Sequence, residues 1–290
     1  MQRSFLFVLA VGGILSFTSC APPKGSSIVI GAKNFTEQVV LGELLAQEIE
    51  AVSRLRVERR FYLAGSYLCQ QALVSGRIDG YVEYTGTALT AILKQPLPEA
   101  KDRAQVFQTV KTLYESRFGV RVEPGLGFED TFAMVVRGDE RPELRRISDV
   151  KGQMRLGVGY EFQARPDGLA GLEQAYGVQF GTPRVMDLGL LYRALAAKQV
   201  DIVAGNSTDG PIRALGFRVL EDDRHYFPPY EAVPLIREDS LREHPEIQVA
   251  MERLAGKVSA GEMQAMNDAV DGKHEDVGVV VRRFRAGKGL

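Results

Sequence analysis

Three short segments of the sequence place aromatic rings beside hydroxyl or acidic groups. They are Tyr84-Thr85-Gly86-Thr87, Asp130-Thr131-Phe132 and Phe227-Pro228-Pro229-Tyr230. An aromatic face attracts a desolvated cation through its quadrupole, and hydroxyl and amide groups at the start of a helix attract a carboxylate. These segments therefore favour the binding of a small zwitterion or cation.

Two basic residues are candidate clamps for the carboxylate of such a ligand. Lys33 and Arg165 each stand in a turn after an expected strand, and the Arg guanidinium matches a carboxylate in a bidentate way. A single Tyr, by contrast, is more often a core or surface residue than a ligand contact. The binding hypothesis therefore requires that the fold brings these residues together.

Strands and helices alternate along most of the chain. Short β-branched runs predict strands at 28–30, 57–63, 78–82, 120–122, 132–136, 155–158 and 201–204, and helical spacing predicts helices at 67–74, 87–93, 103–118, 168–176, 188–197 and 277–284. Asn34 followed by Glu37 favours a helix N-cap, with Thr36 as the competing cap. Apolar residues at helical spacing in 245–270 are expected to pack against the first unit. The alternation predicts an α/β protein with parallel, doubly wound sheets, in two units that follow one another.

The two units contain a short internal repeat. Residues 73–82 and 195–204 resemble each other at an offset of 122 positions, and at this offset Tyr84-Thr85-Gly86-Thr87 falls opposite Asn206-Ser207-Thr208-Asp209. Ligands of open α/β sheets bind beyond the carboxyl ends of the strands. Two such loops facing each other predict a cleft between the units, and chance similarity of strand patterns is the alternative.

The first twenty residues differ from the rest. Arg3 precedes an apolar stretch at 5–15, and small residues lead to Cys20, which predicts an export signal at 1–20 followed by a tether at 21–27. The residues before Cys20 resemble the lipobox of bacterial lipoproteins, in which that Cys carries the lipid anchor, although Phe17 replaces the usual Leu. An ordinary signal peptide with an incidental Cys is the alternative. Cys69 then lacks a disulfide partner and is expected to be buried.

The composition excludes several classes of function. The 290 residues are 45% hydrophobic and 25% charged, with a net charge of -1 and no basic run of five or more residues, so we expect no nucleic acid as partner. No His or Cys spacing suits a metal, and no nucleophile motif appears, so we expect neither a cofactor nor enzymatic activity. A periplasmic sensor or an enzyme built on the same two α/β units remains the alternative.

Five blocks of sequence resemble those of a known family. They are Gly31-Ala32-Lys33-Asn34-Phe35-Thr36-Glu37-Gln38, Glu83-Tyr84-Thr85-Gly86-Thr87, Glu161-Phe162-Gln163-Ala164-Arg165-Pro166-Asp167-Gly168, Ser207-Thr208-Asp209-Gly210 and the stretch 220–230. The order of these blocks, from Ile28 to the C-terminus, resembles the glycine betaine/choline/carnitine-type (osmoprotectant) substrate-binding proteins of ABC importers.

The resemblance implies a fold, a location and partners. The fold is the two-lobed type II periplasmic-binding-protein fold with a ligand cleft between the lobes, with lobe 1 at 28–128 plus 229–290 and lobe 2 at 129–228. The expected protein is a monomer, held by Cys20 at the outer face of the cytoplasmic membrane in the periplasm. It hands its ligand to an ABC permease and its ATPase.

The resemblance also implies roles for particular residues. Tyr84, Tyr230, Phe132, Asp130 and Asn206 match positions around the ligand cation, Lys33, Thr87 and Arg165 match positions around its carboxylate, and Gln38 and Thr208 are further pocket candidates. Phe132 stands where a Tyr is usual, and Asn206 stands where another aromatic ring is expected. The expected ligand is betaine-like, with ergothioneine or another amino-acid-derived cation as the alternative.

Overall fold

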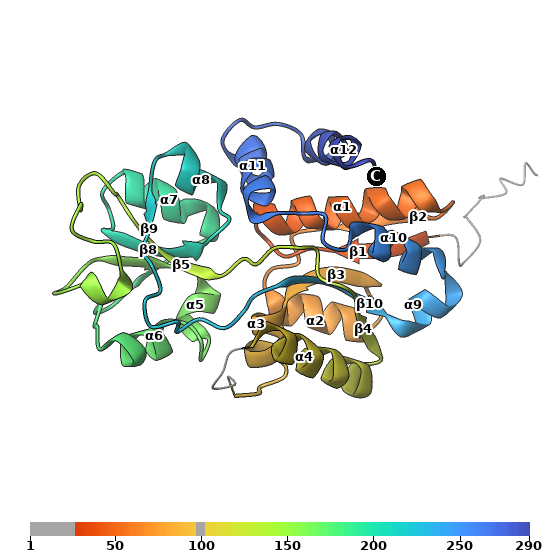
Figure 1. Ribbon diagram of the computed structural model, residues 1–290, viewed down its shortest axis with the longest axis horizontal. Coiled ribbons are helices and arrows are strands. Elements are labelled where there is room, and N and C mark those ends of the chain that lie inside the picture. The colour runs from red at the N-terminus through yellow and green to blue at the C-terminus, as the bar shows by residue number, and fades with distance from the viewer. Residues whose placement is uncertain (1–26, 97–101) are drawn as a thin grey trace, which may run out of the picture.

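The computed structural model describes residues 27–96 and 102–290, which form two lobes, each built around its own five-stranded sheet (Figure 1). The expected signal segment, its Cys20 and most of the tether lie outside the described residues. The two lobes are joined by two segments that run side by side, because Glu129 bridges to Glu231 and the Asp130 amide donates to the Tyr230 carbonyl.

The sheet of the first lobe has the strand order β2-β1-β3-β10-β4. Its strands are β1 (Ser27–Gly31), β2 (Arg56–Arg60), β3 (Gly80–Tyr84), β4 (Val120–Val122) and β10 (Ala232–Arg237). The first three strands are parallel, and β10 runs antiparallel to β3 and β4. All five residues of β3 are buried, as expected for a strand covered on both faces.

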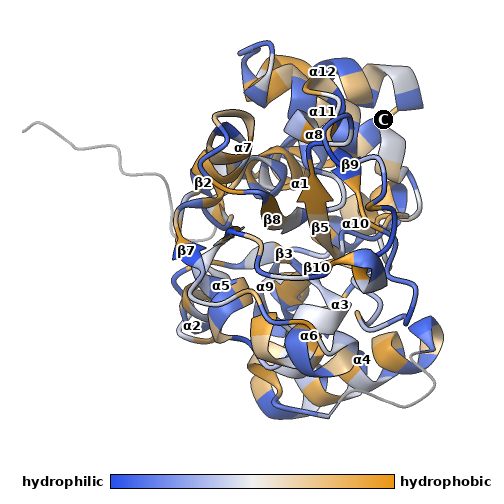
Figure 2. Cartoon of the chain, turned by 90° about the vertical axis from the view of Figure 1, so that its left-hand side faces the viewer, coloured by the Kyte–Doolittle hydropathy of each residue, from blue (hydrophilic) through white to orange (hydrophobic). Residues whose placement is uncertain are grey.

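The sheet of the second lobe has the order β7-β6-β8-β5-β9. Its strands are β5 (Phe132–Val136), β6 (Leu156–Val158), β7 (Arg184–Val185), β8 (Ile202–Asn206) and β9 (Arg218–Val219). β6 is parallel to β7 and β8, whereas β5 is antiparallel to β8 and β9. Figure 2 shows the hydrophobic character of β5 and β8, which form the inside of this lobe.

The expectation of purely parallel sheets is wrong. Both β10 and β5 follow directly on a crossing between the lobes, without the helical crossover that parallel neighbours need. Ala232 at the start of β10 pairs with Tyr84 at the end of β3, and Phe132 at the start of β5 pairs with Asn206 at the end of β8. Each crossing strand therefore begins where its neighbour ends, between the lobes.

Helices cover both faces of the first sheet (Figure 1). The first lobe has α1 (Thr36–Val52), α2 (Ser66–Val74), α3 (Thr85–Thr87), the π-helix η1 (Ala88–Ile92), α4 (Arg103–Phe118), α9 (Glu238–Glu243), α10 (Glu246–Leu254), α11 (Ala260–Asp271) and α12 (Val277–Lys288). The second has the 3-10 helix η2 (Ile147–Asp149), α5 (Tyr160–Ala164), α6 (Leu169–Tyr176), α7 (Leu188–Ala196) and α8 (Gly210–Ala214). As expected for 245–270, α10 and α11 pack on α1 of the first lobe, with Ile247, Met251 and Met263 buried, and α11 also packs on α8 of the second lobe.

Four local expectations differ from the structure near the cleft. The strand expected at 57–63 ends at Arg60, and the strand expected at 78–82 runs from Gly80 to Tyr84. Helix α1 begins at Thr36 without a side-chain cap, because Phe35 occupies the cap position. Glu37 accepts from Tyr84, Thr208 and Asn267 instead of from the helix start. The expected helix at 87–93 is a short α-helical turn followed by η1, a geometry that often marks functional sites.

Cys69 is fully buried in α2, as expected, and burial raises the pKa of its thiol to about 12. A thiol in this state packs as a small hydrophobic group. Within the described ranges, no helix combines the length and the apolar character needed to cross a membrane.

Candidate functional site

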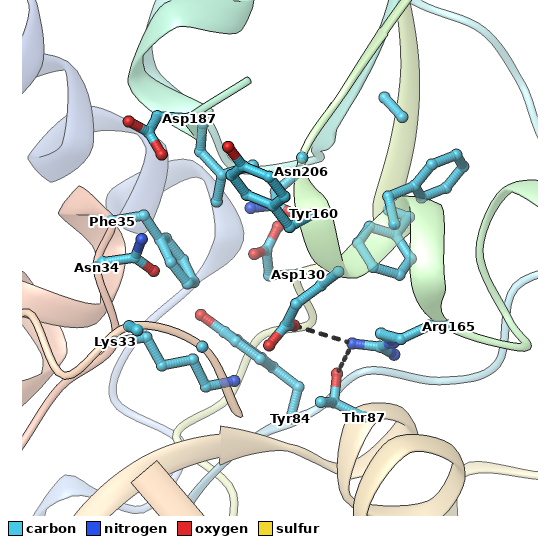
Figure 3. Close-up of a pocket in the computed structure, with 18 of the residues that line it drawn as sticks. Lys33, Asn34, Phe35, Tyr84, Thr87, Asp130, Tyr160, Arg165, Asp187 and Asn206 are labelled. Carbon is cyan, nitrogen blue, oxygen red and sulfur yellow. Dashed lines mark hydrogen bonds and ion pairs between the residues drawn. The ribbon is translucent and has the colours of Figure 1, made fainter. Parts of the chain in front are cut away.

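A cavity of about 220 Å³ lies between the two lobes (Figure 3). The first lobe contributes Lys33, Asn34, Phe35, Ala64, Gly65, Tyr84 and Thr87, the second contributes Phe132, Gly159, Tyr160, Glu161, Phe162, Arg165, Met186, Asp187, Leu188, Ala204 and Asn206, and the crossing segments contribute Asp130 and Tyr230. Most of these residues follow the carboxyl ends of β1, β3, β6, β7 and β8, where α/β sheets bind their ligands.

Eight of the ten residues that the sequence nominates for ligand contact line this cavity. They are Lys33, Tyr84, Thr87, Asp130, Phe132, Arg165, Asn206 and Tyr230. The loops that follow β3 and β8 thus meet at one cavity, as the internal repeat predicts. Gln38 and Thr208 are buried behind its wall, since Thr208 donates its hydroxyl to Glu37 and Gln38 lies next to the Tyr84 hydroxyl.

Arg165 is held by a buried carboxylate and by a hydroxyl of the opposite lobe. Its Nε and Nη2 donate to Asp167 at 2.9 and 2.5 Å, and its Nη1 donates to Thr87 Oγ1 at 2.9 Å. Burial by itself would lower the pKa of the guanidinium, but Asp167 outweighs it and the pKa is raised. Arg165 therefore stays charged at the edge of the cavity.

Lys33 forms the second basic contact of the cavity. Its ammonium group donates to Glu83, and both side chains are buried. The same ammonium lies 5.0 Å from the centre of the Tyr84 ring. Both basic residues are thus already paired with an acid, so a ligand carboxylate would share them with Glu83 and Asp167.

The aromatic residues of the cavity fall into two groups. Phe132, Phe162 and Tyr230 pack edge to face, with centroids 5.0 Å apart for Phe132 and Phe162 and 5.7 Å apart for Phe132 and Tyr230. Arg165 lies 4.8 Å from the centre of the Phe132 ring and 5.8 Å from that of Tyr230. The protein's own cation thus lies against two rings that the sequence nominates for a ligand cation.

The second aromatic group surrounds open space. Phe35, Tyr84 and Tyr160 face one region of the cavity, and Asp130 lies beside them (Figure 3). The Tyr84 hydroxyl donates to Glu37 Oε1 at 2.7 Å, which fixes the ring, whereas Tyr160 is 65% exposed. This region combines ring faces with an acidic group, the surroundings that attract a cation.

Three carboxyl groups lie on this side of the cavity: Glu37 and Asp130 are buried, and Asp209 is half-buried. Burial raises the pKa of Glu37, Asp130 and Asp209, and the neighbouring carboxyl groups raise that of Asp130 further. The pKa of Asp209 reaches about 7, although the Tyr192 hydroxyl and the Asn206 amide both donate to it. The acidic side therefore lacks the basic partners that the other side has.

Contacts between protein groups join the lobes around the cavity. Glu161 of α5 accepts the Ser66 amide at 2.6 Å and the Ser66 hydroxyl at 3.3 Å at the start of α2. Burial raises the pKa of Glu161, but Lys33 and Arg165 outweigh it, so the pKa is lowered. The Glu161 carboxylate thus closes one edge of the cavity.

Sequence reasoning did not nominate twelve of the residues that line the cavity, among them Asn34, Phe35, Tyr160 and Asp187. Asn34 and Phe35 were interpreted as part of a helix start. Tyr160 lies two residues beyond the end of β6, after Gly159, and Asp187 lies two residues beyond β7. The strand-end rule that identifies Tyr84 would also have identified Tyr160, had the short β6 been given the same weight.

Comparisons with known proteins agree with this arrangement. Residues 26–287 match the family described as the substrate binding domain of ABC-type glycine betaine transport systems. The chain is 34% identical to the carnitine transport binding protein OpuCC of Listeria monocytogenes, over 98% of this chain and 96% of that protein. It is 29% identical to the ergothioneine transport permease/ergothioneine binding protein EgtU of Helicobacter pylori, over 99% of this chain but only 52% of that protein.

A solved structure shows the same fold. The crystal structure of a glycine betaine/carnitine/choline ABC transporter superimposes with a TM-score of 0.76 at 31% identity, over 90% of this chain and 98% of that chain. The two-lobed α/β architecture expected from the sequence is confirmed.

The half-buried Asp209 predicts a measurable pH dependence of stability. Because its pKa rises from 3.8 to about 7 on folding, the folded chain holds this proton more tightly than the unfolded chain does. Its contribution is complete below pH 4 and declines as the pH rises to 7, by on the order of 4 kcal/mol. Urea unfolding at pH 4, 5.5 and 7 should therefore show a smaller decline for Asp209→Asn than for the parent.

Asp201→Asn is the matched control, because Arg155 lowers the pKa of Asp201 to about 2 and its effect has the opposite sign. Identical pH profiles for the parent and Asp209→Asn would contradict the burial argument.

Proposed function

The chain belongs to the family of substrate-binding domains of ABC-type glycine betaine transport systems, which makes it the solute-binding component of an ABC importer, and we propose that its cavity holds a quaternary ammonium zwitterion. Glycine betaine and carnitine are the leading ligands, with choline as a cation of the same type. The protein would deliver the bound solute to a permease and its ATPase from the extracytoplasmic side.

The observation that carries this proposal is the division of the cavity into two chemically opposite sides. Asp130 lies on one side with Phe35 and Tyr160, and Arg165 with Thr87 lies on the other, while the Lys33 ammonium lies over the Tyr84 ring. A zwitterion has the same division within one small molecule. The volume of about 220 Å³ is also below the range of about 300–1,000 Å³ typical of pockets for drug-sized ligands.

On the cation side, we propose that the ammonium group lies against Tyr84 and Asp130, with Phe35 and Tyr160 completing the ring of aromatic faces. Each cation–π contact is worth about 0.5–2 kcal/mol. Phe132 and Tyr230 would then not contact the ligand cation. Their rings pack against the Arg165 guanidinium and hold it facing the ligand carboxylate. Asn206 supplies an amide in place of a ring.

Ergothioneine is the second candidate ligand. The relative from Helicobacter pylori is named for it, and it is a betaine that also carries a polar ring. Asn34, Asp187 and Asn206 line the cavity and offer groups that could bind the ring nitrogens. These residues support a ligand with more hydrogen-bonding groups than glycine betaine has.

The location of the protein and the limits of its lobes are part of the same proposal. We propose that residues 1–20 direct export, that residues 21–27 tether the protein, and that the lobes comprise 28–128 plus 229–290 and 129–228. The monomer would act at the outer face of the cytoplasmic membrane.

A lipid on Cys20 should hold the protein in the membrane fraction of cells that express the full chain. Cys20→Ser removes the thiol that accepts the lipid, so this variant should not incorporate a labelled fatty acid and should leave the membrane fraction. Cys69→Ser is the control, because its thiol is buried in the fold. Equal labelling of the parent and Cys20→Ser would exclude the anchor.

Calorimetric titration of glycine betaine, carnitine, choline and ergothioneine tests the ligand. Tyr84→Ala removes both a ring face and its buried contacts, and should weaken binding of the true ligand by about 10-fold or more. Tyr84→Phe keeps the ring and loses only the hydroxyl bond to Glu37, so it should bind more tightly than Tyr84→Ala. If no quaternary amine binds the parent chain, the ligand proposal fails.

Arg165→Lys tests the contact with the ligand carboxylate separately from the contact with its ammonium group. Lys keeps the charge but cannot form the bidentate pair with Asp167 and still reach Thr87. Binding of glycine betaine should weaken by roughly 10-fold, the value of about one charge-assisted hydrogen bond. Choline has no carboxylate and should be much less affected, so equal losses for both ligands would contradict the assignment of Arg165.

A further inference from the structure

Glu37 is a fully buried residue that connects both groups of the proposed cation site. Its Oε1 accepts the Tyr84 hydroxyl, and its Oε2 accepts the Thr208 hydroxyl at 2.5 Å and the Asn267 amide at 2.9 Å. The Thr208 amide in turn donates to Asp130 Oδ1 at 3.2 Å. Glu37 lines not this cavity but an adjoining one that shares Asn34 and Phe35 with it, and its bonds reach the proposed site through Tyr84 and Thr208.

The donors to this pair of carboxyl groups are all neutral. Glu37 is bonded by two hydroxyls and an amide, and Asp130 is bonded by the Thr208 amide and, at 3.3 Å, by the Ser207 hydroxyl. In the part of the chain that the structure describes, no basic side chain forms an ion pair with either of them. This differs from Glu83 and Asp167, which have Lys33 and Arg165 as partners.

The charged and titratable groups around Glu37 do not supply the missing positive charge. Asp130 and Asp209 face it from the second lobe, and Tyr84 lies at the end of β3. Asp271 of α11 and Arg193 of α7 line an adjoining cavity together with Glu37, but among the described residues Arg193 forms no ion pair with Glu37 or Asp130. The nearest ammonium group, that of Lys33, lies at the Tyr84 ring and is bonded to Glu83. Two neighbouring carboxyl groups that are this deeply buried cannot both be ionised without a counter-ion.

We propose that Glu37 determines the preference for cations: in the ligand-free protein Glu37 and Asp130 share one proton, and a ligand ammonium group that lies against Asp130 displaces this proton into water. The proposal deepens the proposed function and rests on it. The charge of the site is conserved, because one positive charge leaves as another enters. A neutral solute of the same shape cannot make this exchange and is bound less tightly.

The exchange fixes how affinity depends on pH. Burial raises the pKa of both groups, so at acidic pH the proton competes with the ligand. Affinity for a cation therefore increases with pH, by up to about 10-fold per pH unit when one proton is released, and becomes constant once the pair has lost its proton.

Calorimetry with glycine betaine and choline in two buffers of equal pH and different ionisation enthalpy counts the protons released. At pH 6 we expect between a few tenths of a proton and one proton per ligand for the parent chain. Glu37→Gln removes the like charge beside Asp130, so proton release should fall toward zero and the affinity should become constant at a lower pH. Equal proton release in the parent and in Glu37→Gln, or no release in a parent that binds, overturns the proposal.

Glu123→Gln is the matched control, since Glu123 is also a buried carboxyl with a raised pKa, but it lies beyond β4 and bonds to Gln248. This variant should release as many protons as the parent. If Glu37→Gln does not fold, Thr208→Val tests the same proposal, with a shift of the pH profile in the opposite direction. It removes a hydroxyl that stabilises the ionised pair, so the pH at which affinity becomes constant should rise, and an unchanged pH profile overturns the proposal.

Carbon NMR titration of the carboxyl groups in the ligand-free protein separates this proposal from the proposed function. Asp130 should titrate well above the usual range for Asp, and at lower pH in Glu37→Gln than in the parent. An ordinary Asp130 titration overturns the shared proton whichever ligand binds. A raised titration together with no binding of any quaternary amine refutes only the proposed ligand.

Discussion

The geometry of the cavity depends on one buried ion pair, between Arg165 and Asp167. Both side chains are almost fully withdrawn from water, and such a pair is stable only when its remaining hydrogen-bonding positions are used. The first lobe and the crossing segment supply these bonds: Thr87 accepts from Arg165, and the hydroxyls of Thr90 and Tyr230 donate to Asp167 at 3.0 and 2.6 Å. The pair therefore fixes the second lobe against the first and holds Arg165 at the cavity.

This use of Arg165 determines how the other charges act. Because the basic side of the cavity is neutralised by Asp167 and Glu83, the site as a whole does not attract anions. The acidic side, with Glu37, Asp130 and Asp209, has no such compensation. A ligand thus gains more from bringing a positive charge than from bringing a negative one, and its carboxylate serves mainly to orient it.

Much of the site could be predicted because Tyr84, Asp130 and Asn206 lie at strand ends or crossings, where topology alone brings residues together. The sequence could not predict which aromatic rings lie against the proposed ligand cation and which lie against Arg165. The contact of Arg165 with Phe132 depends on how two loops of the second lobe pack, which no local pattern encodes. The contacts of Glu37 could not be predicted either, because its spacing from Asn34 is that of a helix cap. The sequence nominates its neighbour Gln38 instead, and neighbouring residues of a helix point about 100° apart.

Two glycines allow the lobes to approach each other closely. A Cβ on Gly65 would lie 2.3 Å from the Glu161 carboxylate, and one on Gly210 would lie 2.6–2.8 Å from the backbone of α11. A side chain on Gly210 would meet the α11 backbone and hold α8 away from it, whereas a side chain on Gly65 would require the Glu161 side chain to move. Protein contacts therefore supply the shape of the closed arrangement. A ligand needs to add only the differential affinity that favours this arrangement over the open one, and the uncompensated charge beside Asp130 is where that affinity can arise.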